Sequence, residues 1–514
     1  MGTDRAVAHD RVVHGATERH LPRRPAAKWA NAERSDGGAG WRAVPRAPPA
    51  RTGRPPVRGR APGRRARYRS RVSSSTASPT PTTRIGRPLA AWAAWDWGSA
   101  AFNHVVTTFV FTVYLTGSVA ADEASGSSAL ATAISVSGVL VALVAPVYGQ
   151  RSDAAGAEVG RQRRLGWLTA VVILCTALMA FVAPAPSYLW WGLLMLGIGT
   201  FAYELAQVEY NAMIYRLAPP GRTGRVSGIG WAAGYVGGIV LLLLCFVLFL
   251  ADTPVIAFEG EGTAVRVVVL IAAVWFAVST IPVLRMRFPF PPPPGDTEAA
   301  VGWLASYKLL VRRLVRLYHE DRHLLGFLVS SAIYRDGLTA VFTFGGVLAA
   351  GTFGLTPGDV IVFAIVANVV SALGAVLGGW LDDRVGPKIV IIVCLAALVV
   401  TAGGMLFASG PTAFWIGGTF LSLFVGPAQA CSRSYLARIV PPGREGELFG
   451  LYATTGRAVS FLAPALFALF IALFGAQRWG ILGIGLVLLL GLATLIPIRA
   501  VPGAAAAGQA AVRV

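Results

Sequence analysis

Twelve apolar stretches, most of them about twenty residues long, alternate with short polar segments over most of the chain. Roughly twenty apolar residues is the length that a helix needs to cross the hydrocarbon core of a bilayer. The pattern therefore predicts an all-α integral membrane protein with twelve transmembrane helices. The expected spans are 89–115, 130–149, 165–183, 188–215, 227–251, 265–284, 324–351, 358–380, 388–408, 411–438, 449–474 and 479–498.

Basic residues gather in every second loop between these spans. Loops two, four, six, eight and ten carry Arg or Lys, whereas the other loops carry acids or little charge, with Arg266 and Arg478 as exceptions. Because Lys and Arg concentrate in the cytoplasmic loops of membrane proteins, both termini are predicted to be cytoplasmic. We expect the plasma membrane as the location.

The chain contains one long internal repeat. Residues 206–228 and 428–450 align at a constant offset of 222 residues, and both copies contain Pro-Pro-Gly-Arg. A period of this length is far too long for a solenoid and indicates a duplicated half. The spans are therefore predicted to form two pseudo-symmetric six-helix halves, 89–284 and 324–498, joined by a cytoplasmic linker, 285–323.

The linker itself has two parts. Residues 289–294 are almost all proline, which predicts a stiff extended spacer. A basic amphipathic stretch follows at 303–317. It is either a helix that lies along the cytoplasmic membrane surface or a solvated linker helix.

Composition supports the membrane assignment and locates the charge. Of 514 residues, 14% are charged, against roughly 25% in a soluble protein. Residues 1–88 hold 20 of the 45 basic and 5 of the 25 acidic residues, so +15 of the net +20 lies in this tail. A charge confined to one tail does not indicate a nucleic-acid-binding protein.

The tail shows no apolar periodicity. It is predicted to be a disordered basic cytoplasmic tail, or sequence included by a wrongly assigned start; its run 58–71 could bind anionic lipid or RNA. Residues 499–514 form a C-terminal tail.

The four cysteines show no metal-ligand spacing, so no metal and no cofactor is expected. The sequence has no phosphate-binding GxxxxGK loop, which argues against an ATP-driven pump.

The second and eighth loops share a motif in which Gly-x-x-x-Asp is followed by glycine and basic residues. Glycine permits close helix packing, and the carboxylate can pair with a cation or a helix N-terminus of the other half. We expect these loops to latch the cytoplasmic side and to release it during alternating access. The first copy departs from the pattern by an insertion at 157–160. The gating residues are Gly149, Asp153, Arg161, Gly379, Asp383, Arg384 and Lys388.

Polar residues inside the spans are the candidates for substrate or proton binding. A charge at mid-membrane costs about 2.5–3.5 kcal/mol on insertion scales, so such residues are usually paired or functional. The first and fourth helices of each half supply them. The candidates are Asp96, Asn103, His104, Glu204, Gln207, Asn211, Tyr334, Arg335, Asp336, Gln429, Ser432 and Arg433.

Each candidate has a structural alternative. Asp96 lies near the cytoplasmic end of its span and is either a transport residue or a packed acid. For Arg335 and Asp336 we favour buried ion pairs with other helices. His104 is more commonly a packed histidine than a titrating one. Glu204 lies deeper than Glu209 and is the better proton or substrate site.

Several stretches resemble the vacuole-effluxer branch of the major facilitator superfamily, notably Trp95–Tyr114, YRDG at Tyr334–Gly337, and Gln429–Pro464. Eukaryotic members of that branch are linked to autophagy and to amino-acid release from vacuoles. The resemblance implies the major facilitator fold and secondary transport, with amino acids as the leading substrate class. Residues 98–100 read Gly-Ser-Ala where the family usually has Ala-Asn-Ser.

Taken together, the sequence predicts a secondary active transporter, not an enzyme, that exports amino acids or similar polar metabolites by alternating access. Its expected partners are a small-molecule substrate, protons and the lipid bilayer, and it is expected to be a monomer. One alternative is efflux of multidrug-type or lipid-like amphiphiles. An alternative of another class is a non-transporting membrane sensor or scaffold that uses the basic tail and the central loop.

Overall fold

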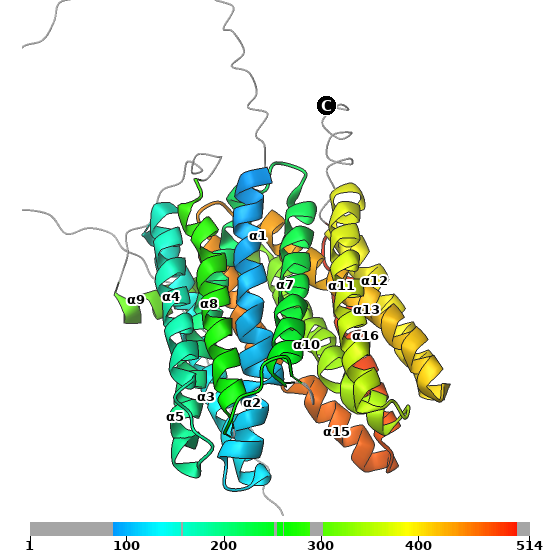
Figure 1. The fold of residues 1–514 in the computed structure, drawn as a ribbon. Helices are drawn as coiled ribbons and strands as arrows, with labels where there is room; N and C mark the ends of the chain where they lie inside the picture. Colours follow the sequence, from blue (N-terminus) through cyan, green and yellow to red (C-terminus); the bar gives the residue numbers. More distant parts are fainter. Residues whose placement is uncertain (1–85, 156–157, 251–253, 261, 288–301, 501–514) are drawn as a thin grey trace, which may run out of the picture. The chain divides into compact units, whose positions relative to one another are not determined.

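A computed structural model describes residues 86–155, 158–250, 254–260, 262–287 and 302–500 (Figure 1). Regular structure in these ranges is entirely helical, as the sequence predicted. The basic tail, the proline-rich spacer and residues 501–514 lie outside the described residues.

The first half contains six spans. They are the series α1 (Gly86–Ala100), η1 (Ala101–Phe109), α2 (Phe111–Tyr114) and η2 (Leu115–Val119), then α3 (Glu123–Ala154), α4 (Glu158–Met179), α5 (Leu189–Ala212) with α6 (Ile214–Leu217), α7 (Thr223–Cys245) and α8 (Thr263–Arg285).

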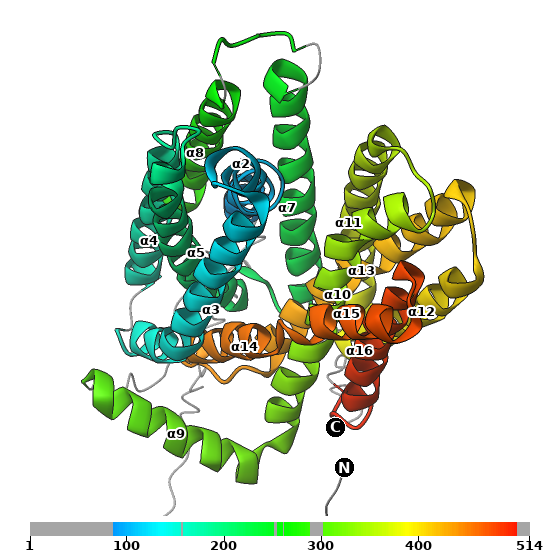
Figure 2. The same cartoon turned by 90° about the horizontal axis from the view of Figure 1, so that it is seen from below.

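The second half repeats this arrangement. Its spans are α10 (Arg322–Gly351), α11 (Pro357–Val385), α12 (Pro387–Phe407), α13 (Pro411–Ile439), α14 (Glu445–Val459) with α15 (Leu462–Phe474), and α16 (Gly480–Leu495). The halves meet chiefly along two helix pairs, α3 with α14 and α7 with α11 (Figure 2). Each predicted span coincides with a helix or helix series, so the twelve-helix prediction holds.

Ten of these spans are long and apolar enough by themselves to cross a membrane. The other two have visible reasons for falling short. The helix α4 carries three arginines near its start, at 161, 163 and 164, and the first span is divided among four short helices. The hydroxyls of Thr107 and Thr108 both donate to the Asn103 carbonyl oxygen, at 2.8 and 2.7 Å, within the π-helical part. Such side-chain bonds compete with regular helical bonding.

The eleventh span is also interrupted, which the sequence analysis missed. It breaks at Ser460 and Phe461 between α14 and α15. Pro464 lacks the N–H that a continuous helix would offer to the Ser460 carbonyl. The Asp336 carboxylate accepts a hydrogen bond from the Ala463 N–H at 2.7 Å and so satisfies the new helix start.

Close packing of α1 on α7 sets the position of the first helix. Gly230, Gly237 and Gly238 lie on α7 where any Cβ would meet α1–η1, respectively at Trp92, Trp97 and His104. Small residues let helix backbones approach within a membrane, and α7 uses three of them here.

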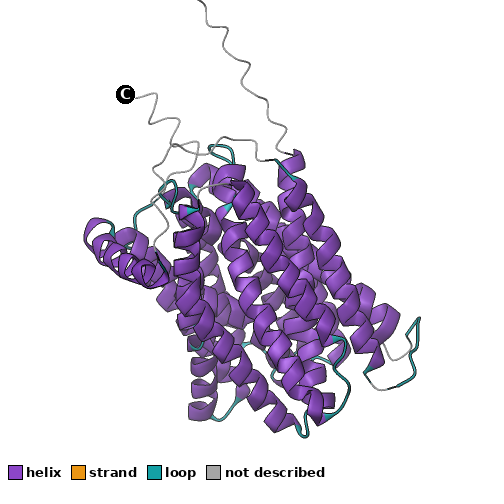
Figure 3. Cartoon of the chain, turned by 90° about the vertical axis from the view of Figure 1, so that its left-hand side faces the viewer, coloured by secondary structure: helices purple, strands orange, loops and turns teal. Residues whose placement is uncertain are grey.

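We call the end of the bundle where α3 and α11 end and α7 and α14 begin the basic end. The helix α9 (Trp303–Glu320) lies near this end and runs across the spans rather than along them (Figures 1 and 2). The described residues form helices joined by loops (Figure 3). Large apolar side chains are exposed elsewhere on this bundle, for example Phe407 and Val400. Such a surface is stable against lipid tails and not against water.

Candidate functional site

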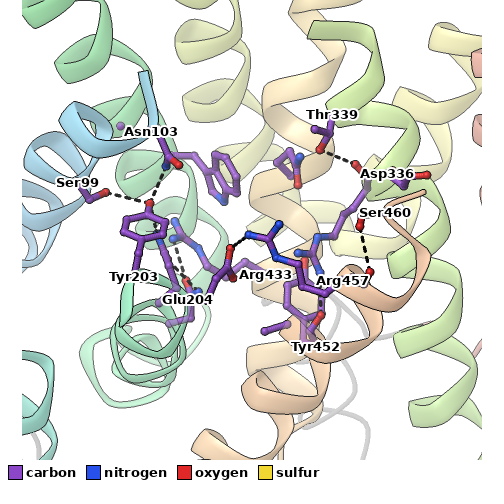
Figure 4. Close-up of a pocket in the computed structure, with 18 of the residues that line it drawn as sticks. Ser99, Asn103, Tyr203, Glu204, Asp336, Thr339, Arg433, Tyr452, Arg457 and Ser460 are labelled. Atoms are coloured by element: carbon purple, nitrogen blue, oxygen red, sulfur yellow. Dashed lines mark hydrogen bonds and ion pairs between the residues drawn. The ribbon is translucent and has the colours of Figure 1, made fainter. Parts of the chain in front are cut away.

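A cavity of about 570 Å³ lies between the two halves (Figure 4). Helices α1, α5 and α7 with η1 form one wall, and α10, α13 and α14 form the other. Ten of the twelve candidate residues line it: Asp96, Asn103, His104, Glu204, Gln207, Asn211, Arg335, Asp336, Gln429 and Arg433.

The other two candidates lie behind the wall. The Tyr334 hydroxyl donates to the Ser432 hydroxyl at 2.7 Å, and Ser432 lies 2.7 Å from the Tyr452 hydroxyl. Tyr334 and Ser432 are fully buried, whereas Tyr452 reaches the cavity. Tyr334 and Ser432 therefore support the cavity wall from behind, and only Tyr452 of these three residues faces the cavity.

On the first wall, polar side chains are organised around Tyr203. Its hydroxyl oxygen accepts hydrogen bonds from the Asn103 amide at 2.6 Å and from the Gln207 amide at 2.7 Å. The Gln207 carbonyl in turn accepts from the Asn211 amide at 3.2 Å. A buried network in which each group is satisfied holds its members in fixed orientations.

Arg433 connects this network to the other half. Its guanidinium donates to Asn211 Oδ1 at 3.2 Å and to Asp96 Oδ2 at 3.4 Å, both across the interface. Two further bonds reach the hydroxyl and the carbonyl oxygen of Ser227, at 3.0 and 2.7 Å. The group also lies 4.9 Å from the ring of Trp92. Arg433 is only 4% exposed, so its charge depends on these partners.

Asp96 is held in turn by the aromatic residues beside it. Trp92 and Trp95 both stack on Tyr210 with ring centroids 4.4 Å apart, and the Trp95 indole N–H donates to the Thr169 hydroxyl at 3.0 Å. This packing fixes the turn of α1 that carries the carboxylate.

A second ion pair crosses the cavity between Glu204 on α5 and Arg457 on α14. The Arg457 side chain is 30% exposed, against 17% for Glu204, so this pair is the more accessible of the two. The sequence analysis did not select Arg457. It lies in the predicted span 449–474, and the cost of an intramembrane charge was the signal that could have found it.

Arg335 and Asp336 do not form the ion pairs that we favoured from sequence. Asp336 accepts from the start of α15, and the Arg335 guanidinium lies 3.7 Å from the Tyr452 ring centroid and donates to the Tyr452 carbonyl at 3.2 Å. Among the described residues, neither has an oppositely charged side chain within 4.0 Å. The N-terminus of α15 stabilises the Asp336 carboxylate, and the face of the Tyr452 ring stabilises the Arg335 guanidinium. Neither partner is a charged side chain, so neither could be recognised from the charges in the sequence.

Two further candidates make local contacts. His104 Nδ1 lies 3.1 Å from the Ala100 carbonyl oxygen, one turn earlier in the same span. Gln429 is buried at the cavity wall on α13.

The sequence analysis missed Tyr203, the centre of the polar network on the first wall. Tyrosine carries no charge, so the cost of burying a charge could not single it out.

At the basic end, each half places a carboxylate on a helix start of the other half. Asp153 accepts from the N–H groups of Gly446 and Glu447, both at 2.8 Å. Asp383 accepts from the N–H groups of Gly224 and Arg225, at 2.8 and 3.2 Å. A carboxylate at a helix N-terminus satisfies unpaired donors and interacts favourably with the helix dipole. The first copy makes this contact although its loop departs from the pattern.

Glycine brings the helices together at these two contacts. A Cβ on Gly149 would meet the Gly446 backbone, and one on Gly379 would meet the Gly224 backbone. One turn further on, Gly228 and Gly450 face the backbones of residues 375 and 145 in the same way. Four glycines of the internal repeat, at 224, 228, 446 and 450, thus pack closely at the two loop motifs. We call this pair of close contacts the seal of the basic end.

The other gating residues divide into two groups. Arg161 pairs with Asp153 at 2.8 Å and with the fully buried Glu209 at 3.1 Å, so it belongs to the contact. Arg384 instead lies over its own neighbour Trp380, and Lys388 donates to backbone carbonyls at the end of α16. In the second half Arg438, not Arg384, pairs with Asp383, at 3.0 Å.

The described residues contain no group of three or more His, Cys, Asp or Glu side chains that could hold a metal ion. All four cysteines are free and buried.

Comparisons with known proteins agree with this architecture. The profile of the family described as vacuole effluxer Atg22 like matches residues 215–508, and that of the major facilitator superfamily matches residues 21–242. An uncharacterized MFS-type transporter of Bacillus subtilis, YxiO, is 26% identical over 414 residues, which cover 79% of this chain and 93% of that protein.

The Aspergillus clavatus autophagy-related protein 22-2 is 26% identical over 277 residues, 49% of this chain and 44% of that protein. The chain therefore spans less than half the length of this fungal relative.

Solved structures with the same fold include the major facilitator transporter FucP in an outward conformation, with a TM-score of 0.63 and 14% identity over 81% of this chain and 99% of that one. The human organic anion transporter MFSD10 has a TM-score of 0.61 and 16% identity, over 80% and 99%. Both the twelve-span fold and the resemblance seen in the sequence are thereby confirmed. The chain belongs to the Atg22-like vacuole effluxer family and is a multi-pass major facilitator transporter, not an enzyme.

Proposed function

We propose that this transporter exports amino acids, or small polar metabolites of the same zwitterionic kind, across the plasma membrane by alternating access. The observation that carries the proposal is the division of charge between the cavity walls. Asp96 and Glu204 stand on the first half, and Arg335, Arg433 and Arg457 on the second. Asp336 also lines the second half, but its carboxylate is bonded to the start of α15.

A zwitterion suits this division because it carries both signs in one small molecule. Its ammonium group can approach the acidic wall while its carboxylate approaches the arginines, which replaces the internal pairs Asp96–Arg433 and Glu204–Arg457 without leaving a charge unbalanced. A substrate with one sign of charge would leave one wall unpaired. The amino-acid release associated with vacuole effluxers supports the same substrate class.

The sealed basic end gives the direction of access in this conformation. Positive residues concentrate on the cytoplasmic side of membrane proteins, so we assign the basic end to the cytoplasm. On this assignment we infer that the cavity opens to the outside, because the close contacts between the halves lie at the basic end. Breaking the Asp153 and Asp383 contacts while the far end closes would complete the cycle.

The test is transport by the purified full-length protein in liposomes under an imposed proton gradient, with a panel of labelled amino acids. Counter-flow of at least one amino acid, abolished in a Glu204→Gln/Arg457→Gln double variant, is the expected result. Failure of every amino acid, in protein whose thermal unfolding is intact, would overturn the substrate class.

The aromatic part of the cavity favours a second candidate, efflux of amphipathic compounds. Trp231, Tyr235, Phe344, Phe449 and Tyr452 all reach the lining. Altered drug tolerance in a deletion strain whose amino-acid excretion is normal would support this candidate over the first.

A further inference from the structure

The linker helix α9 has one side that is attached to the bundle. Ser306, Leu310 and Leu317 are at most 9% exposed and lie on this side. The Tyr307 hydroxyl donates to the Leu143 carbonyl of α3 at 3.0 Å, and Arg313 pairs with Glu447 of α14. Leu143 lies eleven residues before the end of α3, so α9 lies beside the span and not beyond its end.

The opposite side of α9 is largely exposed, although the Arg322 guanidinium lies over the Tyr318 ring, 5.2 Å from its centroid. Leu304 is 81% exposed, Val311 58%, Val315 55% and Tyr318 55%. At 3.6 residues per turn these four fall on one strip. Lys308, Arg312 and Arg316 are also exposed and form the strip next to it.

An apolar strip next to a basic strip is the arrangement of a helix that lies at a membrane surface, with apolar groups among the acyl chains and cations at the headgroups. Anionic headgroups complement the basic strip, and each nearby Lys or Arg adds to the attraction. The orientation of α9 across the spans fits this location (Figure 2).

The attached side of α9 reaches the seal at the basic end. Glu447, the partner of Arg313, also pairs with Arg444 at 2.6 Å, and its own N–H is one of the two that donate to Asp153. Arg313 therefore holds the same turn of α14 that the loop motif of the first half caps. A ligand that favours one position of α9 will favour the arrangement of α14 that goes with it.

We propose that the exposed side of α9 binds anionic phospholipid of the surrounding bilayer and that this binding stabilises the sealed basic end through Arg313 and Glu447. The lipid site stands independently of the transported substrate. Its effect on the seal rests on alternating access as proposed above.

The lipid site is tested by native mass spectrometry of the full-length protein with added phosphatidylglycerol. The triple variant Lys308→Gln/Arg312→Gln/Arg316→Gln should retain less lipid than wild type. The matched control is Arg163→Gln/Arg222→Gln/Arg285→Gln, which removes three exposed arginines elsewhere near the basic end. Equal lipid retention by wild type and both triple variants would overturn the site.

The effect on the seal is tested with a cysteine at Thr343, an exposed residue of the cavity lining, reacted with a membrane-impermeant maleimide added outside sealed liposomes. The native cysteines are buried and give a low background. Adding phosphatidylglycerol to phosphatidylcholine should speed labelling about threefold to tenfold in wild type and control, and not in the α9 triple variant.

The variant Arg313→Gln separates the two steps. It keeps the exposed strips, so we expect it to bind lipid normally and to lose the labelling response. A response that persists in Arg313→Gln, or that is equal in the α9 triple variant, would refute the coupling. The labelling needs no substrate, so failure of amino-acid transport would leave both results interpretable.

Discussion

The Arg433 guanidinium of one half lies 3.4 Å from the Asp96 carboxylate of the other, at the wall of the central cavity. Both side chains are largely buried, at 5% and 13% exposure. Arg433 also keeps Asn211, Ser227 and the Trp92 ring as partners. Asp96 is therefore one of several partners of the Arg433 guanidinium, and among these partners it alone carries a negative charge. A substrate carboxylate can replace the Asp96 carboxylate beside Arg433, and a proton can neutralise it.

Replacing Asp96 by Asn should strongly reduce proton-coupled transport while leaving the amount of folded protein unchanged. The amide keeps the shape of the carboxylate, and Arg433 retains its other partners. A hydrogen bond to a charged group contributes about 1.5–3 kcal/mol, so we expect a loss of about tenfold to a hundredfold in transport rate. Flux in proteoliposomes and abundance by quantitative immunoblot are the measurements. Normal flux would remove Asp96 from the mechanism.

The pair Glu204–Arg457 can be tested by exchange of its charges. Glu204→Gln and Arg457→Gln should each lower transport, because each leaves the partner charge unbalanced. The exchanged variant Glu204→Arg/Arg457→Glu should recover stability but not transport, since the sign of each wall is then reversed. Thermal unfolding and flux measured together form a double-mutant cycle. Full recovery of flux in the exchanged variant would show that the pair is structural only.

Removing the Tyr203 hydroxyl should loosen the polar network of the first wall. In Tyr203→Phe the amides of Asn103 and Gln207 lose their shared acceptor, at a cost of about 1–3 kcal/mol if they stay unpaired. We expect a lower unfolding temperature and weaker substrate affinity, read by thermal shift with and without ligand. Phe344→Tyr is a suitable comparison, because it adds a hydroxyl at the same cavity without touching this network.

The glycine contacts predict how the basic end responds to a single added methyl group. Gly379→Ala places a Cβ against the Gly224 backbone, and overpacking of this kind costs about 1–3 kcal/mol. We expect the halves to separate at the basic end, with faster labelling of cysteines introduced there. Gly404→Ala on α12 is the matched control, because no heavy atom lies within 4 Å of its added Cβ. The same labelling rate in both variants would contradict a tight seal.

The start of α15 depends on Asp336. Asp336→Ala should destabilise the protein by about 0.5–2 kcal/mol, the usual cost of losing a side-chain helix cap, whereas Asp336→Asn can still accept from the Ala463 N–H. Unfolding temperatures of the two variants provide the measurement. An equal loss in both would show that the charge, and not the hydrogen bond, is what α15 requires.

Local pattern was sufficient for the spans, the two halves and most of the charged residues of the cavity lining. A bilayer demands long apolar helices, so span length and loop charge are legible in the chain itself. The cost of burying a charge likewise selected Asp96, Glu204 and Arg433 before any geometry was known. The break in the eleventh span was missed because one proline inside a membrane helix does not decide between a kink and a break.

Sequence alone therefore determined which residues are too polar to face lipid, and the duplicated Pro-Pro-Gly-Arg segments determined that two halves exist. Only the tertiary structure decided the partners. It paired Arg433 with Asp96 and moved Asp336 from an expected ion pair to the start of α15. It also joined the loop carboxylates Asp153 and Asp383 to helix starts that lie 293 and 159 residues away in the sequence. Polarity belongs to a single side chain, whereas neutralisation of a charge depends on which groups the fold brings within a few ångströms.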